Sequence, residues 1–331
     1  MRIGYPCINR SIGCSANRTF RLANYSEKRL FETVAGNLDC LFRILRENVR
    51  NGFFFHRISS DLVPFASHPV CIHSWQHEFA ADFTAIGKFI RAHGIRISMH
   101  PDQFTLLNSP RVEVVERSVA ELAYHAEALD LMGLDEDARI QIHVGGAYGD
   151  KAAAVERFVE RFHLLDHAVR RRLAVENDDR LFTFADCCRV FERVGIPVIF
   201  DNLHHAVNSS GEDLPSVFRR LSQLWPTRCG VPMTDYSDQA AEAKPGVHAE
   251  HLDAESFAGY LRATVGHDFD IMLEIKDKEK SAAVALAIAR REAAARLVGA
   301  SEMFCRNHVL RSLTAENCPG VGCKAKNSDY S

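Results

Sequence analysis

Histidine and carboxylate side chains recur along this chain directly after short apolar runs. Six successive runs end in such a side chain, at His100, His143, Glu176, Asp201 with His204, Asp235 and Glu274. Two further histidines, His68 in PFASHP and His248 in GVHAEH, follow other runs. Imidazole and carboxylate together suit zinc, manganese or iron better than calcium or magnesium alone. The set is large enough for two or three ions, so the sequence predicts a metal site.

Clustered cations favour one kind of chemistry. They polarise a phosphoryl oxygen, lower the pKa of water and stabilise a leaving oxygen. We therefore predict metal-assisted hydrolysis of a phosphodiester, with Glu176, His143 and Glu274 as the catalytic residues. One alternative remains open at this point: a sugar isomerase, which uses similar ligands around paired metals.

The elements that must position these residues alternate regularly. Strand-like runs are predicted at 2–5, 52–58, 95–99, 139–144, 173–175, 197–200, 231–234 and 271–273. Segments of helical period are predicted at 27–50, 78–93, 111–132, 151–168, 183–194, 213–224, 253–265 and 278–299. Eight such pairs are typical of a TIM (β/α)₈ barrel, in which side chains at the strand ends converge on one mouth. An open doubly wound sheet is less favoured, because YPCINRSIGCS contains no glycine-rich phosphate turn.

Other histidines are interpreted as structural, because they lie on predicted helices or beside a better candidate. They are His125, His163, His167 and His205.

Composition restricts the class of protein further. The chain has 331 residues, of which 47% are hydrophobic, and a net charge of −3. That charge argues against a protein that coats DNA through a general basic field. The objection weakens if metals neutralise the four predicted carboxylate ligands.

No apolar run reaches 18 residues and MRIGYP does not resemble a signal peptide, so we expect a cytosolic protein, in the prokaryotic cytosol or nucleoid, that does not enter a membrane. Most of the ten cysteines are then expected to be reduced.

Taken together, several motifs resemble the UV damage endonuclease family of xylose-isomerase-like barrels. They are RIGYPCIN, NRTFRLAN, PFASHP, SMHPDQF, IHVGGAYG, AVENDDR, FDNLHHAVN, PGVHAE and LEIKDKE. The resemblance covers residues 1 to 280. It implies a barrel that binds up to three divalent ions, typically manganese, and that nicks damaged double-stranded DNA immediately 5′ to ultraviolet photoproducts. No obligate protein partner is expected, and a protein that binds damaged DNA without cutting it remains an alternative.

The resemblance also implies roles for individual residues. The metal ligands are His68, His100, His143, Glu176, Asp201, His204, Asp235, His248 and Glu274. Asp235 stands where many members have histidine, and Met233 stands where some have a lysine that is carboxylated. Tyr5 and Asn9, placed on the loop after the first strand, resemble residues that line the lesion pocket. Gln103 and Phe104 resemble a Gln–Tyr pair that probes damaged base pairs.

The last thirty residues differ in composition from the rest. We expect residues 1–299 to form the barrel and residues 300–331 to form a C-terminal appendage. In it, Cys305, His308, Cys318 and Cys323 offer three thiols and an imidazole. These groups could bind a structural zinc ion tetrahedrally.

Overall fold

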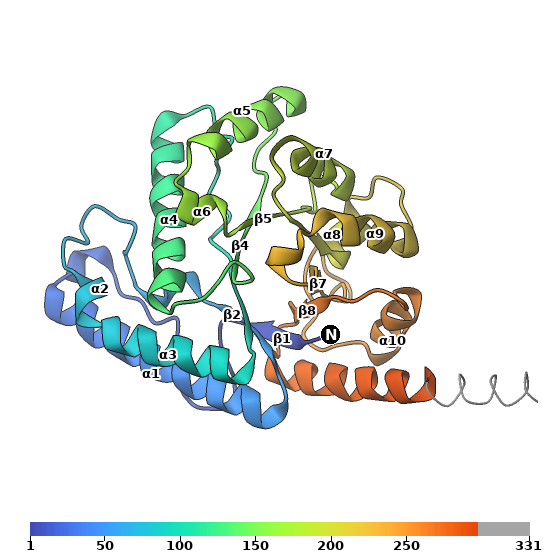
Figure 1. Ribbon diagram of the computed structural model, residues 1–331, viewed down its shortest axis with the longest axis horizontal. Coiled ribbons are helices and arrows are strands. Elements are labelled where there is room, and N and C mark those ends of the chain that lie inside the picture. The colour runs from blue at the N-terminus through green and yellow to red at the C-terminus, as the bar shows by residue number, and fades with distance from the viewer. Residues whose placement is uncertain (297–331) are drawn as a thin grey trace, which may run out of the picture.

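Eight parallel strands close into a barrel in the computed structural model, which describes residues 1–296 (Figure 1). Each strand pairs with the next along the chain, and β8 pairs with β1 through Ile3 opposite Ile271. The strands are β1 (Ile3–Pro6), β2 (Phe55–Ile58), β3 (Arg96–Met99), β4 (Arg139–His143), β5 (Leu173–Glu176), β6 (Val198–Asp201), β7 (Met233–Tyr236) and β8 (Asp270–Leu273). The predicted (β/α)₈ barrel is confirmed.

Helices surround the barrel in the order that the sequence predicts. They are α1 (Glu27–Asn51), α2 (Trp75–Glu78), α3 (Ala80–His93), α4 (Val112–Leu131), α5 (Lys151–Leu164), α6 (His167–Arg170), α7 (Phe184–Val194), α8 (Asn202–Val207), α9 (Leu214–Leu221) and α10 (Ala254–Ala263). A further helix begins at residue 279. Short 3₁₀ turns lie at η1 (Leu22–Asn24), η2 (Ser60–Leu62), η3 (Ser222–Leu224) and η4 (Thr227–Cys229). The sequence did not predict α8, which carries His204.

Local signals explain where the helices begin and end. The Ser26 side chain caps α1 by accepting from the Arg29 N–H, and Thr183 and Asp186 form a reciprocal capping box at α7. Glycines in the left-handed conformation, such as Gly52 and Gly195, terminate α1 and α7. Asp201 caps α8, so one carboxylate ends β6 and begins the next helix.

Two strand boundaries differ from the prediction in a way that affects the site. Strand β7 begins and ends two residues later than expected, and β6 extends to Asp201. The apolar run ends before the strand does, because the polar residues that follow still take part in the parallel pairing, with Asp201 opposite Asp235. These carboxylates therefore lie within the barrel wall rather than on mobile connections.

The described residues contain one disulfide and several free cysteines. Cys14 and Cys40 form a disulfide between the loop after β1 and helix α1. Free thiols are found at Cys7, Cys71, Cys187, Cys188 and Cys229. None of the described helices is long and apolar enough to cross a membrane. The predicted zinc ligands Cys305, His308, Cys318 and Cys323 lie outside the described residues.

Close packing of α3 against α4 gives a stability prediction. A Cβ on Gly87 would overlap the carbonyl oxygen of Met132, whereas a Cβ on Gly259 in α10 would meet nothing within 4 Å. We expect G87A to lower the free energy of unfolding by about 1–3 kcal/mol, because overpacking forces the backbone to move. We expect G259A to raise it by up to about 1 kcal/mol through helix propensity. Urea unfolding of both variants checks this, and equal shifts would contradict the packing argument.

Candidate metal centre at the barrel mouth

Three groups of metal-capable side chains lie at the carboxyl ends of the strands, each with ligand atoms within 4.8 Å of one another. The groups are His100, His143 and Glu176; Glu176, Asp201 and His204; and Asp201, Asp235 and Glu274. Neighbouring groups share one carboxylate. Shared carboxylates can bridge adjacent cations, so the three groups together could hold more than one ion.

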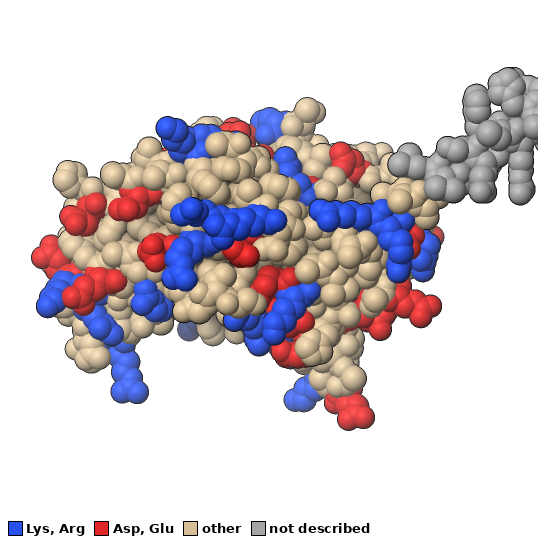
Figure 2. Space-filling view, turned by 90° about the horizontal axis from the view of Figure 1, so that it is seen from below, with Lys and Arg blue, Asp and Glu red and all other residues tan. Residues whose placement is uncertain are grey.

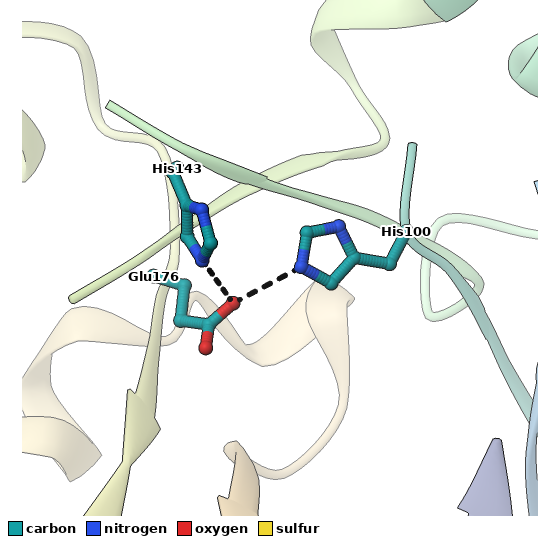
Figure 3. Close-up of side chains that lie close together, drawn as sticks. All are labelled: His100, His143 and Glu176. Atoms are coloured by element: carbon teal, nitrogen blue, oxygen red, sulfur yellow. Dashed lines mark ion pairs between the residues drawn. The ribbon is translucent and has the colours of Figure 1, made fainter. Parts of the chain in front are cut away.

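Glu176 belongs to the first two of these groups. Its Oε2 lies 3.4 Å from His100 Nε2 and 3.3 Å from His143 Nε2, and both rings converge on it in Figure 3. The residue is only 1% exposed. Burial alone would raise the pKa of this carboxyl, but His143, His100 and His204 outweigh burial and hold the pKa well below its usual range. Glu176 is therefore an anion in the barrel interior.

His204 approaches the same carboxylate from α8. Its Nδ1 donates to the backbone carbonyl of Asn177 at 2.9 Å and lies 3.1 Å from Glu176 Oε1. Burial lowers the pKa of this ring, but Asp201 and Glu176 outweigh that effect and raise it to about 11. Burial raises the pKa of Asp201 to about 6. Without a metal, protons thus supply the positive charge that a bound cation would supply on displacing them.

Arg57 and Gln141, which no sequence pattern assigned to the site, connect several of these ligands by hydrogen bonds. The Arg57 Nη2 donates to Asp235 Oδ2 at 2.8 Å and to Gln141 Oε1 at 2.8 Å, and Nη1 pairs with Glu274. The Gln141 Nε2 donates to Asp235 Oδ2 at 2.5 Å and to Glu176. Burial raises the pKa of Glu274, but Arg57 outweighs it and lowers the pKa to about 2. The sequence offered one signal for Arg57, which is a charged residue inside the apolar run FFFHRIS.

The two remaining predicted ligands, His68 and His248, are not members of the three groups, although His248 Nδ1 lies 3.6 Å from Glu274 Oε2. His248 donates from Nδ1 to the backbone carbonyl of Glu274 at 2.7 Å, which leaves Nε2 free to bind a cation, and it lines the same cavity as Glu274. His68 Nδ1 accepts from the Val70 N–H at 3.0 Å, so its neutral ring carries the proton on Nε2. His68 lines a neighbouring pocket, with Asp102 and Phe104.

Histidines interpreted as structural lie away from the three groups. His125, for example, is fully buried and contacts the Glu121 carbonyl and the Ser60 hydroxyl.

A cavity of about 650 Å³ opens above the metal-capable residues. Gln103 lines it, and Phe104, next in sequence, lines the neighbouring pocket and is 71% exposed. Tyr5 lies within β1 rather than on the loop that follows, and it is fully buried. Its hydroxyl donates to Asn48 and accepts from the Asn9 amide at 2.8 Å. Asn9 is also buried, and its Oδ1 accepts from the N–H groups of Ser11 and Ile12, so neither predicted residue lines the cavity.

The donor set fits divalent cations. Asp201 Oδ2 is buried and has no hydrogen-bond partner among the described residues, and the buried His143 Nε2 has only its ion-pair contact with Glu176. Buried polar atoms without partners are costly, and a metal ion would satisfy both. Two imidazoles with a carboxylate in the first group, and three carboxylates in the third, suit divalent metal ions.

Charges of both signs lie on the face of the molecule that Figure 2 shows. Figure 2, seen from below Figure 1, shows lysine and arginine side chains lying among aspartate and glutamate side chains. This mixture agrees with the net charge of −3. Attraction for an anion must therefore come from local groups at the mouth rather than from a general field.

Comparison with known proteins adds an independent finding. The family model described as UV-endonuclease UvdE matches residues 1–298. A UV DNA damage endonuclease of Clostridium perfringens is 36% identical over 284 residues, which cover 85% of this chain and 69% of that protein. The crystal structure of SacUVDE superposes with a TM-score of 0.85 at 43% identity, covering 88% of this chain and 98% of that one. Endonuclease IV from Thermus thermophilus, at 17% identity and a TM-score of 0.57, shares the fold, covering 88% of this chain and 98% of that one.

Proposed function

Since this chain belongs to the UV-endonuclease UvdE family and is a DNA repair endonuclease, we propose that it nicks double-stranded DNA immediately 5′ to ultraviolet photoproducts and related lesions by metal-assisted hydrolysis. The three overlapping ligand groups around Glu176 carry the metal part of this proposal. The lesion part is supported by the relatives, which are UV DNA damage endonucleases. We further propose that the protein acts in the cytosol, where prokaryotic DNA lies.

We propose manganese as the ion, in two or three copies. Bound ions would supply positive charge to the phosphoryl oxygens and lower the pKa of water. His100, His143 and His204 would hold them with Glu176, Asp201 and Glu274. Two further ligand atoms lie next to these residues, the His248 Nε2 and the Asp235 carboxylate. Asp235 already accepts hydrogen bonds from the Arg57 guanidinium. His68 joins the set only if its loop changes position.

The chain's own residues have separate tasks in this reaction. Glu176 is fixed by Gln141 below and by three imidazoles around it, so its negative charge has one position. Arg57 pairs with both Asp235 and Glu274 and keeps the pKa of Glu274 low, whereas burial raises the pKa of Asp235 well above its usual range. Such preorganisation means that little reorganisation is needed when a phosphate enters. Gln103 and Phe104, at the rim, are placed to contact the bases of a distorted duplex.

A plasmid assay tests the proposal directly. We expect nicking of ultraviolet-irradiated plasmid in manganese, much weaker nicking of untreated plasmid, and none in excess chelator. Nicking should return when manganese is restored to the chelated protein. Mapping the cut on a duplex with one defined photoproduct checks that it lies 5′ to the lesion and leaves a 3′-hydroxyl.

Other outcomes would contradict specific parts. Equal nicking of both plasmids would contradict lesion recognition, and undiminished nicking in chelator would contradict the metal mechanism. Binding to irradiated DNA without nicking would favour the non-catalytic alternative. The sugar isomerase alternative is disfavoured by membership of the endonuclease family.

A further inference from the structure

The loop after β8 uses its acidic side chains for contacts within the protein. Glu274 pairs with Arg57, and Asp277 Oδ2 accepts from His251 Nδ1 at 2.9 Å. Glu279 accepts from the Arg10 N–H at 3.0 Å and from the Ser11 hydroxyl at 2.6 Å, which ties this loop to the loop after β1. Each carboxylate of the loop therefore already has a partner other than a lysine.

Lys278, in the same loop, is left without such a partner. Within residues 1–296, its Nζ makes no hydrogen bond and no ion pair by the distances in this structure. The residue is half-buried and lines the 650 Å³ cavity together with His100, His143 and Glu274. Burial lowers the pKa of its ammonium, which reflects the poor solvation of this group. An incompletely paired cation thus borders the cavity above the metal-capable residues.

The backbone at this position is unfavourable for a lysine. Lys278 has a φ of 58°, in the left-handed region that glycine adopts without penalty. The loop is held there by the Lys276 N–H donating to the Ala249 carbonyl and by the Asp277 N–H donating to the Glu250 carbonyl, each at 3.1 Å. Glycine would be the better residue for stability alone. Strained side-chain positions of this kind concentrate at functional sites.

We propose that the Lys278 ammonium binds a non-bridging oxygen of the DNA phosphate that is cut, as a fixed cation beside the metal ions. The inference rests on the proposed function. In the hydrolysis, the water oxygen forms a bond to phosphorus, and the bond from phosphorus to the 3′-oxygen breaks. The electron pair of that bond leaves with the 3′-oxygen, which ends with one proton of the water. Lys278 keeps its protons and stabilises the charge that develops on the phosphoryl oxygens.

Other cations near the mouth are less suited to this task. Arg57 already binds Asp235 and Glu274 and is 3% exposed, so a phosphate cannot replace these partners cheaply. The Arg10 guanidinium lies 3.6 Å from Glu250 on an exposed surface. Lys276 lines the cavity too but is exposed, so water already solvates its ammonium. Partial burial makes Lys278 the cation that gains most from an incoming anion.

Three variants test the proposal: K278Q, K278R and K278G, with K280Q as the matched control on the exposed start of the next helix. At saturating lesion-containing duplex in manganese, we expect the single-turnover rate of K278Q to fall by about 10- to 100-fold. The K278R rate should stay within several-fold, and K280Q should match the wild type. In chelator, the slope of log Kd against log salt should fall by about one for K278Q.

K278G separates this role from a structural one. Relief of the left-handed strain should keep or raise its melting temperature while its nicking rate falls as in K278Q. Unchanged metal content by elemental analysis, in all variants, is also expected. A K278Q rate within twofold of the wild type, or a K278G variant that melts well below it, would overturn the proposal. If the wild-type chain does not nick irradiated DNA, the proposed function fails instead, and the salt slope still measures the phosphate contact.

Discussion

Glu176→Gln is expected to lower the single-turnover rate of nicking by more than about 100-fold, because groups that only support a metal ligand already cost about 10- to 100-fold. Glu176 belongs to two of the three ligand groups, so the substitution weakens both at once. Glutamine keeps the volume and can accept a hydrogen bond, but it removes the negative charge that His100, His143 and His204 surround. Rates on a duplex with one photoproduct, in manganese, give the measurement.

Two further measurements make this result interpretable. Metal content by elemental analysis should fall in E176Q, and the melting temperature should show that the barrel still folds. The control is E156Q, on α5, where Glu156 pairs with Arg193 on an exposed surface. That variant should nick and bind metal as the wild type does. A fast E176Q enzyme in excess chelator would refute the metal mechanism.

Hydrophobic pattern alone predicted the barrel, because each strand is buried on both faces and reads as a short apolar run. The same reasoning misplaced the ends of β6 and β7. Asp201 and Asp235 look like loop residues in sequence, yet they continue the strand pairing at the mouth. Helix α8 was missed because six residues give too short a periodic pattern, although Asp201 at its start is a recognisable cap.

Long-range contacts were the part that sequence reasoning could not predict. Arg57 meets Glu274 across 217 positions and Gln141 across 84, and only barrel closure brings these side chains together. The sequence around a polar residue inside a strand does not reveal which distant side chain it will contact. Their positions after apolar runs and the family resemblance both indicated His68 and His248 as ligands, but neither gives the positions of the loops that carry them. His248 lies at the cavity, whereas His68 lies in the next pocket.

Replacing Gln103 and Phe104 together with alanine is expected to weaken binding to lesion-containing duplex by about 10- to 100-fold, which corresponds to roughly 1–3 kcal/mol. Phe104 is exposed, and its N–H donates to Asp102 Oδ1 at 2.8 Å, which fixes the backbone of the loop. The aromatic face can stack where damaged bases leave the helix, and the Gln103 amide can bind base edges that have lost their partners. Stacking by Phe104 and base contacts by Gln103 both require bases that have left the helix, so both contribute only when the duplex carries a lesion.

Affinity for intact duplex should change little in the same variant, because phosphate contacts supply that affinity regardless of damage. Titrations on matched damaged and intact duplexes, with catalysis blocked by chelator, measure the ratio of the two affinities. L164A, which removes another exposed apolar side chain on α5, is the control and should leave the ratio unchanged. An equal loss on both duplexes would mean that the pair merely orders its loop. A ratio as high as that of the wild type would place recognition elsewhere on the mouth, and the exposed position of Phe104 would then need another explanation.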